Sequence, residues 1–505
     1  MKLRYLSFTL VSLLSFALVA NTDWQDNAQR IWLLSNPYNL TTDYLGVNNP
    51  ALRHYQLDTS LTTLDLVYNN QRERASTNFQ KGDRYRNFTI KAKSQYILST
   101  QSRIWGTASY SNKETKNVRW NNTSDLDILF PYVMADTLGG NMKSETYQFS
   151  GGYLYNFNSP YTLGLEIDYR ADMAYRRNDP RPKNVVSDLN FKLGVSREIS
   201  KKYHLGLGFN AGIYKQDNDV KFFSSLKQIP VYHITGIGMR AVRFDGTFLQ
   251  TTYDGHSLGF NLAINSNDRL GWTSQLKYNR FQFKKIMDDL KNIPLQRLHE
   301  DKIEYQLNYR AKQWVITAEA KYNNRQGKEI LYGSPTGNHY PKLDTKKGYR
   351  NQRREFALQG LYRAQWTQID WVIEPQVRYF YDKATMPNPY QQIMSEKLLF
   401  GAQSSLNWLT TKGAITWFSN FYYTAVITDK YHLDEAVLKS PIYHVVRQEV
   451  TLFKKGEFNS TQTVRYDLPF LISGVSIYAE AQYTVRALQH YKPSHYIGVN
   501  LGIAF

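Results

Sequence analysis

The chain has 505 residues, of which 42% are hydrophobic and 15% aromatic; its formal net charge is +19 and it contains no cysteine. Its mean hydropathy is −0.54, and no stretch after residue 20 approaches the roughly 18 consecutive apolar residues of a transmembrane helix, which excludes a helical membrane protein. The missing cysteines exclude disulfides, Cys-ligated zinc and iron–sulfur clusters, and the many aromatic residues are not typical of a disordered chain.

The first twenty residues have the layout of a secretory signal peptide. Lys2 and Arg4 precede a mostly apolar stretch from Tyr5 to Val19, which is too short for a stop-transfer helix. Small residues follow, so we expect cleavage after Ala17 or Ala20 and treat residues 1–20 as the signal peptide. Because no cysteine stands at this boundary, we expect no lipid anchor.

Residues 21–58 form a separate segment ahead of the first strand. Asp23 to Leu34 predicts a short helix with Trp24, Ile31 and Leu34 on one side, followed by turn-rich sequence. We predict that this segment enters the periplasmic mouth of a barrel as a plug, or docks a periplasmic partner.

From residue 59 to residue 505 the sequence predicts strands that separate an apolar environment from an aqueous one. In the run from Tyr161 to Arg170, odd-numbered residues are apolar or aromatic and even-numbered residues are polar or glycine. Such alternation sends successive side chains to opposite faces of a strand. It recurs at 189–196, 203–213, 302–310, 314–323 and 475–486, and runs of about ten residues are long enough to cross a bilayer at a tilt.

The connections between these runs are sorted by length. Ser200 to Lys202, Asn158 to Pro160, Ala311 to Gln313 and Thr410 to Gly413 predict tight turns, whereas 113–143, 218–254 and 327–351 are long polar excursions. Short connections on one side and long ones on the other are typical of outer-membrane barrels, with the short turns in the periplasm. The fold class predicted is therefore all-β: a transmembrane antiparallel barrel of about 18 strands, within a range of 14 to 18. Expected strand starts are 60, 85, 102, 145, 161, 186, 203, 256, 269, 300, 313, 352, 368, 396, 413, 444, 475 and 495.

Two positions do not fit this strand pattern. Within 444–470, Lys454 to Glu457 has the composition of a hairpin turn, but we expect a strand extended above the membrane because the total must stay even. Pro375 falls in the strand at 368–382, where it cannot donate to the ladder, and predicts a local bulge.

The last strand ends on an aromatic residue. Alternate apolar positions lead to the terminal Phe505, a pattern that resembles the signal read by the barrel-assembly machinery. The predicted assembly-signal residues are Ile497, Val499, Leu501, Ile503 and Phe505.

From about Gly46 to Phe505 the chain resembles an uncharacterised family of large outer-membrane β-barrel proteins. The resemblance rests on the tyrosine-rich strands, on Asn49-Pro50-Ala51 before the first strand and on Phe505. Asn-Pro-Ala at this place is also similar to the opening of long-chain fatty-acid-transporter-like barrels, in which the N-terminal segment contributes to a plug. The chain is similar to porin-like barrels as well. The resemblance implies a fold and no residue-level chemistry.

The polar faces of the strands carry both signs of charge. Mixed charge with Asn, Gln and Thr is typical of a hydrated passage of modest selectivity, although a plugged barrel also needs a polar interior. The predicted lumen-lining residues are Lys91, Lys93, Glu166, Asp168, Lys192, Lys277, Glu304, Arg310, Glu319, Lys321, Asp370, Glu374, Arg378, Glu480 and Arg486.

The sequence shows no legible catalytic or metal-binding constellation. Gly206-x-Gly208-x-x-x-Gly212 lies within a predicted strand, so small lumen-side residues explain it better than a phosphate loop. The carboxylates at 217–219 and 288–289 lack the spacing of a calcium loop. We expect no enzyme activity, no cofactor and no resident metal.

The function expected is that of a porin or transport channel in the outer membrane, passing polar or weakly anionic solutes by diffusion. Two alternatives stay open: a non-conducting anchor or accessory subunit of a surface assembly or secretion complex, and a hydrolase at the barrel rim. Expected partners are outer-membrane lipid and lipopolysaccharide, the barrel-assembly machinery and a periplasmic protein at residues 21–58. The dispersed positive charge and the export signal argue against nucleic acid.

Overall fold

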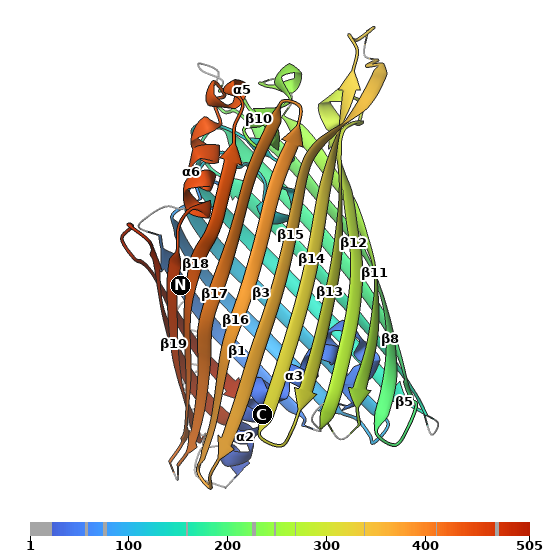
Figure 1. Ribbon diagram of the computed structural model, residues 1–505, viewed down its shortest axis with the longest axis vertical. Coiled ribbons are helices and arrows are strands. Elements are labelled where there is room, and N and C mark those ends of the chain that lie inside the picture. Colours follow the sequence, from blue (N-terminus) through green and yellow to red (C-terminus); the bar gives the residue numbers. More distant parts are fainter. Residues whose placement is uncertain are drawn as a thin grey trace, which may run out of the picture.

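The computed structural model describes residues 23–55, 59–73, 78–157, 160–224, 229–246, 249–267, 269–337, 339–410, 412–469 and 474–505. The predicted signal peptide at 1–20 lies outside these ranges. The described chain folds into an 18-stranded antiparallel sheet that closes on itself (Figure 1). In chain order the barrel strands are β1 (Leu61–Arg72), β2 (Arg84–Ile97), β3 (Ser102–Val118), β5 (Gly140–Asn156), β6 (Tyr161–Arg176), β7 (Arg181–Glu198), β8 (Tyr203–Lys221), β11 (Gln250–Ser266), β12 (Gly271–Met287), β13 (Ile293–Arg310), β14 (Trp314–Tyr332), β15 (Lys342–Gln365), β16 (Ile369–Pro387), β17 (Tyr390–Leu409), β18 (Ala414–His432), β19 (Glu457–Pro469), β20 (Ser476–Leu488) and β21 (Ser494–Ala504).

The barrel closes between its first and last strands. β1 pairs with β21 from Thr63↔Ala504 to Arg72↔His495, and Phe505 and Thr62 exchange two backbone hydrogen bonds of 3.0 and 2.8 Å. Each of the other strands pairs with its neighbour in the chain order of barrel strands. This closure leaves no open sheet edge, which is the condition for a sheet to stand in lipid.

The remaining elements lie at the two ends of the barrel. We call the end of the barrel that carries the short turns the turn end. It holds α2 (Asp23–Ser35), α3 (Pro37–Asn48) and the 3-10 helix η1 (Pro50–Tyr55), seen in blue in Figure 1. The opposite end, the loop end, carries α4 (Leu126–Leu129), η2 (Val242–Phe244), η3 (Asp288–Leu290), α5 (Glu435–Leu438), α6 (Tyr443–Phe453) and a small sheet of β4 (Met134–Ala135), β9 (Tyr232–Gly236) and β10 (Met239–Arg240). Within the described ranges, none of the helices has the length and apolar character of a membrane span.

The outer face of the barrel is an apolar belt. In β6, Tyr161, Leu163, Leu165, Ile167 and Tyr169 all expose 38–45% of their surface, while the even-numbered residues between them are buried or half-buried. Similar exposed apolar rows run along the other strands. A belt this large is unsuited to water and matches the lipid-facing surface of an outer-membrane barrel.

Two details of the predicted strands are wrong. The strand expected to start at 444 is the helix α6, and its barrel strand β19 begins at Glu457. The total remains 18 because Lys454 to Gly456 joins a helix to a strand and is not a hairpin turn. The bulge expected at Pro375 is also absent from the described pairing: Gln359↔Gln376 and Tyr362↔Ile373 keep one register, although the pairs between them are missing. The lost donor of Pro375 thus interrupts the ladder locally without shifting it.

The apolar belt generates the first testable prediction. Leu165→Arg puts a charge at the middle of the apolar run of β6, where it should destabilise the folded barrel by about 2–4 kcal/mol in lipid. Ser150→Arg on neighbouring β5 faces the polar interior and should change stability by only about 0.5 kcal/mol. Urea unfolding of each variant in lipid vesicles measures the difference, and equal losses would contradict a lipid-facing belt.

Candidate functional site

The N-terminal segment, residues 23–55, lies within the turn end and contacts the barrel wall on several sides. The Asn27 amide donates to the carbonyls of Gly474 (2.8 Å) and Ala504 (3.3 Å), and Ile31 packs with Leu61, Tyr478 and Ala504. Further along the segment, the Asn48 amide donates to Gln275 of β12 at 3.1 Å. The predicted helix is confirmed as α2, with Leu34 beside the Ile31 cluster; the side chain of Trp24 lies outside the described residues.

Glycines on β6, β7 and β8 make room for η1. A Cβ added at Gly164 would lie 2.8 Å from the Pro50 carbonyl oxygen, and one at Gly206 would lie 2.8 Å from the Leu52 side chain. A Cβ at Gly194 would overlap the Asn49 side chain. Close approach of a second backbone is a common reason for glycine inside a strand. The structure thus gives two glycines of the Gly206-x-Gly208 motif a packing role against the N-terminal segment.

Glu166 is a polar centre of this contact. Its carboxylate is 4% exposed and accepts hydrogen bonds from Arg53 of η1 (3.1 Å), Trp105 of β3 (2.6 Å) and Lys192 of β7 (2.6 Å). The Arg53 guanidinium also lies 4.4 Å from the centre of the Trp105 ring. Two cations therefore compensate the buried carboxylate, as a buried charge requires.

Two aromatic residues fix the segment to another part of the wall. Trp32 Nε1 donates to Asp370 at 2.7 Å, and Asp370 also accepts from Arg363. The Tyr38 ring lies 3.9 Å from the guanidinium of Arg310 and 5.2 Å from that of Arg363, while its hydroxyl donates to the turn carbonyls of Ala311 and Lys312. Arginines over aromatic faces add attraction that is modest when exposed and larger when water is excluded.

The predicted lumen-lining residues all lie on barrel strands, and ion pairs join many of them. The ion pairs within this set are Lys192 with Glu166 and Asp168, Lys277 with Glu304, Lys321 with Glu319, and Arg378 with Glu319. Arg310 and Asp370 contact the N-terminal segment as described, and Arg486 pairs with Glu457 and Glu73. Lys91 and Lys93 lie on β2, with Asp65 of β1 opposite Lys91 in the ladder. Glu374 lies on β16 and Glu480 on β20.

The loop between β3 and β5, residues 119–139, turns into the barrel at the loop end; we call it the inward loop. Leu129, Tyr132, Val133 and Ala135 of this loop are fully buried. They pack with apolar side chains of the wall, including Val186, Tyr253, Phe283 and Leu298. The long excursion expected at 113–143 therefore includes a packed apolar centre. The signal for it is the apolar run from Leu126 to Val133 within an otherwise polar stretch.

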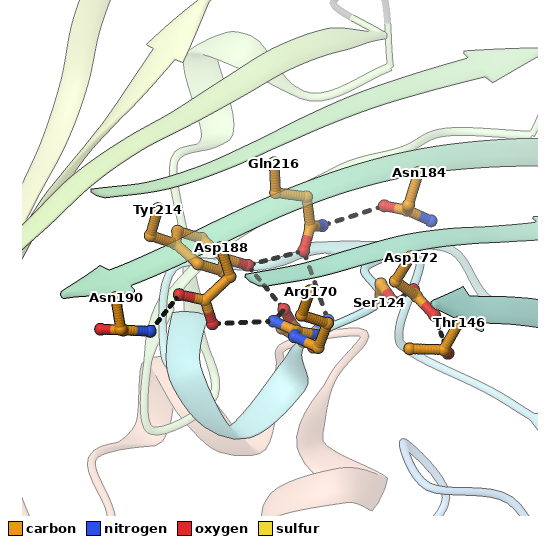
Figure 2. A network of polar contacts seen from close by, with 10 residues as sticks. Ser124, Thr146, Arg170, Asp172, Asn184, Asp188, Asn190, Tyr214 and Gln216 are labelled. Carbon is orange, nitrogen blue, oxygen red and sulfur yellow. Dashed lines mark hydrogen bonds and ion pairs between the residues drawn. The ribbon is translucent and has the colours of Figure 1, made fainter. Parts of the chain in front are cut away.

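Two arginines of β6 fasten the inward loop (Figure 2 shows the network around Arg170). Arg170 donates to both carboxylate oxygens of Asp125, at 3.0 and 2.6 Å, and lies 3.4 Å from Asp188. Near the other end of the loop, Arg176 pairs with Asp136 at 2.5 Å. The two pairs differ in access, because the Arg170 and Asp125 side chains are 19% and 15% exposed whereas those of Arg176 and Asp136 are 1% and 0% exposed.

Sequence reasoning missed these fastening residues. Arg170 ends the polar face of the run from Tyr161 to Arg170, so the alternation already pointed it inward, but no local pattern marks it as the partner of a loop residue. Asp125 and Asp136 belong to a loop, and no local pattern indicates which strand residues they meet.

The helix α6 completes the closure of the loop end. Val446 and Val450 are 2% and 8% exposed and pack with Ile237 of the β8–β11 loop and with Tyr349 and Met386 of the wall. Glu449 lies on this helix, where burial and the nearby Asp382 raise the pKa of its carboxyl to about 7, with Arg353 opposing the shift.

Two cavities with polar linings lie beside the inward loop and along the neighbouring strands. One of about 650 Å³ is lined by β1 to β3 and by inward-loop residues such as Thr123, Ser124 and Asp125. The other, of about 350 Å³, is lined mainly by Thr107, Gln148, Ser150, Asp168, Arg170, Asp188 and Asn190. Both lie within the roughly 300–1,000 Å³ typical of small-molecule sites. Across the described part of the chain, no group of three His, Asp or Glu side chains could hold a metal ion.

The buried ion pair of Arg176 and Asp136, which we call the sealed pair, generates a prediction for the inward loop. Arg176→Met leaves Asp136 buried without its cation, which should lower the free energy of loop opening by about 3–5 kcal/mol. Lys81→Met removes the exposed pair with Asp127 and should cost at most about 1 kcal/mol. Native-state hydrogen exchange of loop amides measures both, and equal effects would contradict the difference in burial.

A pH dependence is expected at α6. The folded-state pKa of Glu449 lies above its ordinary value of 4.5. The packed state of α6 is therefore most stable in acid, where the Glu449 carboxyl is protonated, and it loses this stability as the pH rises through about 7. Glu449→Gln should keep the helix equally protected at about pH 5 and about pH 8, unlike the unmodified chain. Hydrogen exchange of α6 at both pH values tests this, and a wild-type helix with no pH dependence would contradict it.

Several outer-membrane proteins of solved structure are similar to this chain in fold. The ferric preacinetobactin receptor of Acinetobacter baumannii is 8% identical (TM-score 0.41), with 88% of this chain and 80% of the receptor covered. The alcaligin outer-membrane receptor of Bordetella pertussis is also 8% identical (TM-score 0.36; 89% and 76% covered). A FadL homologue of Pseudomonas aeruginosa is 9% identical (TM-score 0.34; 91% and 92% covered). At these values the likeness concerns the fold alone.

No curated protein matches the chain in sequence. A family model does match, over residues 50–505, which includes η1 and every barrel strand. The chain belongs to the family of unknown function DUF6850.

Proposed function

We propose that this protein is an outer-membrane transport barrel for polar or weakly anionic solutes, closed at rest by its N-terminal segment and its inward loop. The apolar belt supports the membrane location, since lipid is the surrounding that a closed barrel with this surface fits. The sorted connections support an orientation with the turn end in the periplasm.

The observation that carries the proposal is the polar space left inside the barrel. A barrel of 16–18 strands is too wide for side chains from its own wall to fill. Here the N-terminal segment occupies the turn end and the inward loop the loop end, yet a cavity of about 650 Å³ beside the inward loop and one of about 350 Å³ along β3 to β7 remain, lined by charged and amide side chains. A barrel that served only as an anchor would have no need for such polar cavities.

Opening at the turn end requires the N-terminal segment to move. Its described contacts include hydrogen bonds and ion pairs such as Arg53 with Glu166, Trp32 with Asp370 and Asn48 with Gln275. Each such contact contributes about 0.5–3 kcal/mol net, because water replaces the lost partner. Movement of the segment must also separate apolar contacts, such as those of Ile31 with Leu61 and Tyr478.

The closure at both ends also favours a second candidate, a non-conducting barrel that acts as an accessory subunit and offers its N-terminal segment to a periplasmic partner. The two candidates differ in a single respect, namely whether solute crosses the barrel. No observation on the described residues favours a hydrolase at the rim.

A reversible cross-link tests the proposal. A Cβ placed at Gly208 would lie 3.5 Å from the Cβ of Asn49, which is within the range of about 3.5–4.5 Å found in disulfides. The chain has no cysteine of its own, so Asn49→Cys with Gly208→Cys gives one defined bridge between the N-terminal segment and β8. We expect vesicles that contain the reduced double variant to pass a small sugar acid, and oxidation to stop that passage.

The single variants Asn49→Cys and Gly208→Cys control for the substitutions, and oxidation should leave their passage unchanged. Equal passage through the oxidised and reduced double variant would refute gating by the N-terminal segment. Absence of passage through the unmodified chain and every variant would refute transport and leave the accessory role.

A further inference from the structure

We propose that Arg170 and Tyr214 form a recognition site for a solute carboxylate, and that Asp125 of the inward loop occupies this site in the closed state. A hydroxylated monocarboxylate such as a sugar acid would displace Asp125 and release the loop. This inference rests on the proposed transport function and names the class of solute that the barrel admits.

The first observation is the geometry around Asp125. Its two oxygens accept from the two terminal nitrogens of Arg170, at 3.0 and 2.6 Å, and one of them also accepts from the Tyr214 hydroxyl at 2.9 Å. A planar fork of two N–H donors matches a carboxylate and no neutral group of similar size. The wall thus presents three donors to the Asp125 carboxylate, while Asp188 of β7 makes only one longer contact of 3.4 Å with Arg170.

Neighbouring side chains hold these donors in place (Figure 2). The Tyr214 hydroxyl lies 3.0 Å from Gln216, and the Gln216 amide donates to Asn184 at 3.0 Å. On its other side, Arg170 lies 3.4 Å from Asp188, which accepts from Asn190. The residues of this network outside Asp125 come from β6, β7 and β8, so the recognition site persists when the loop leaves.

The second observation is that the site borders a cavity. Arg170, Asp168 and Asp188 line the cavity of about 350 Å³, and its hydroxyl and amide groups come from Thr107, Gln148, Ser150 and Asn190. Hydroxyl and amide groups of this kind bind the hydroxyls of a polyol, and a carboxylate at one end of the same molecule would reach Arg170. A hydroxylated monocarboxylate therefore fits both the cavity and the arginine.

The third observation is the contrast between the two fastenings of the loop. The Asp125–Arg170 pair is partly exposed, whereas the Asp136–Arg176 pair is sealed from solvent. A solute can therefore compete at Arg170 while Arg176 keeps the other end of the loop attached. The part of the loop around Asp125 would then move, while the buried residues Leu129, Tyr132, Val133 and Ala135 stay packed against the wall.

Exchanging one carboxylate for another leaves Arg170 paired throughout, so no unpaired charge is exposed to the barrel interior during the exchange. The equilibrium between Asp125 and the solute carboxylate at Arg170 depends on the additional contacts that the solute makes in the cavity. This is because a ligand shifts an equilibrium between the closed and the released loop only by its differential affinity for those two states. A neutral sugar of the same size offers no replacement for Asp125 and leaves the loop in place.

The test combines D-glucuronate and its neutral counterpart D-glucose with three variants of the full chain. Titration calorimetry measures binding, and hydrogen exchange of the inward loop measures its release. With the unmodified chain we expect D-glucuronate, but not D-glucose, to speed exchange in the loop. Asp125→Ala should release the loop and tighten D-glucuronate binding by about tenfold or more, since a charge-assisted contact no longer has to be broken first.

Arg170→Met is the matched opposite variant, because it also frees the loop but removes the recognition group, and D-glucuronate binding should be lost. Arg176→Met frees the loop at the sealed pair and should retain binding. Unchanged binding in Asp125→Ala, or retained binding in Arg170→Met, would overturn the proposal. Neither readout requires passage through the barrel, so this outcome is independent of the cross-linking experiment.

Discussion

Closure of the backbone hydrogen-bond ladder between β1 and β21 is the constraint on which the rest of the structure depends. In the hydrocarbon of a membrane an unpaired N–H or C=O costs several kcal/mol, so a sheet can stand there only as a closed ring. The pairing of Thr63 to Arg72 with His495 to Ala504 completes that ring. Once the ring is closed, the alternation of side chains along every strand must send one half of them to lipid and the other half inward.

The width of the ring creates the second requirement. Eighteen strands enclose more space than the inward side chains can fill. The N-terminal segment enters this space at the turn end of the barrel, and the inward loop enters it at the loop end. The N-terminal helices fit the turn end because Gly164, Gly194 and Gly206 leave room for their backbone. The inward loop carries its own apolar cluster into the loop end. Charged wall residues near these segments act as attachment points, as Glu166 does for Arg53 and Arg170 for Asp125.

The sequence predicted the barrel closely because its main signal is local. The strand starts at 60, 102, 161, 203, 313 and 413 each fall within one residue of the observed starts at Leu61, Ser102, Tyr161, Tyr203, Trp314 and Ala414. The strand expected at 444 failed because the apolar residues of α6, such as Val446 and Val450, face one cluster at helical spacing, and a short amphipathic helix beside a strand is easily taken for its extension.

The interior was beyond sequence reasoning for a physical reason. Asp125 and Arg170 are separated by 45 positions, and Trp32 and Asp370 by 338, so no local pattern relates them. Alternation indicates that a residue faces inward but not which segment it meets there. The sequence therefore predicted a polar lumen. The structure adds the two closures, the unequal burial of the two ion pairs that hold the inward loop, and the two cavities.

The interior of the barrel is held shut by polar contacts such as Arg170 with Asp125, together with apolar clusters of the inward loop and the N-terminal segment. The most direct test of gated transport is the single-channel conductance of the unmodified full chain in a planar bilayer. We predict a channel that is closed for most of the time and shows brief, discrete openings. A steadily open channel would contradict the two closures, and a barrel that never conducts would contradict transport.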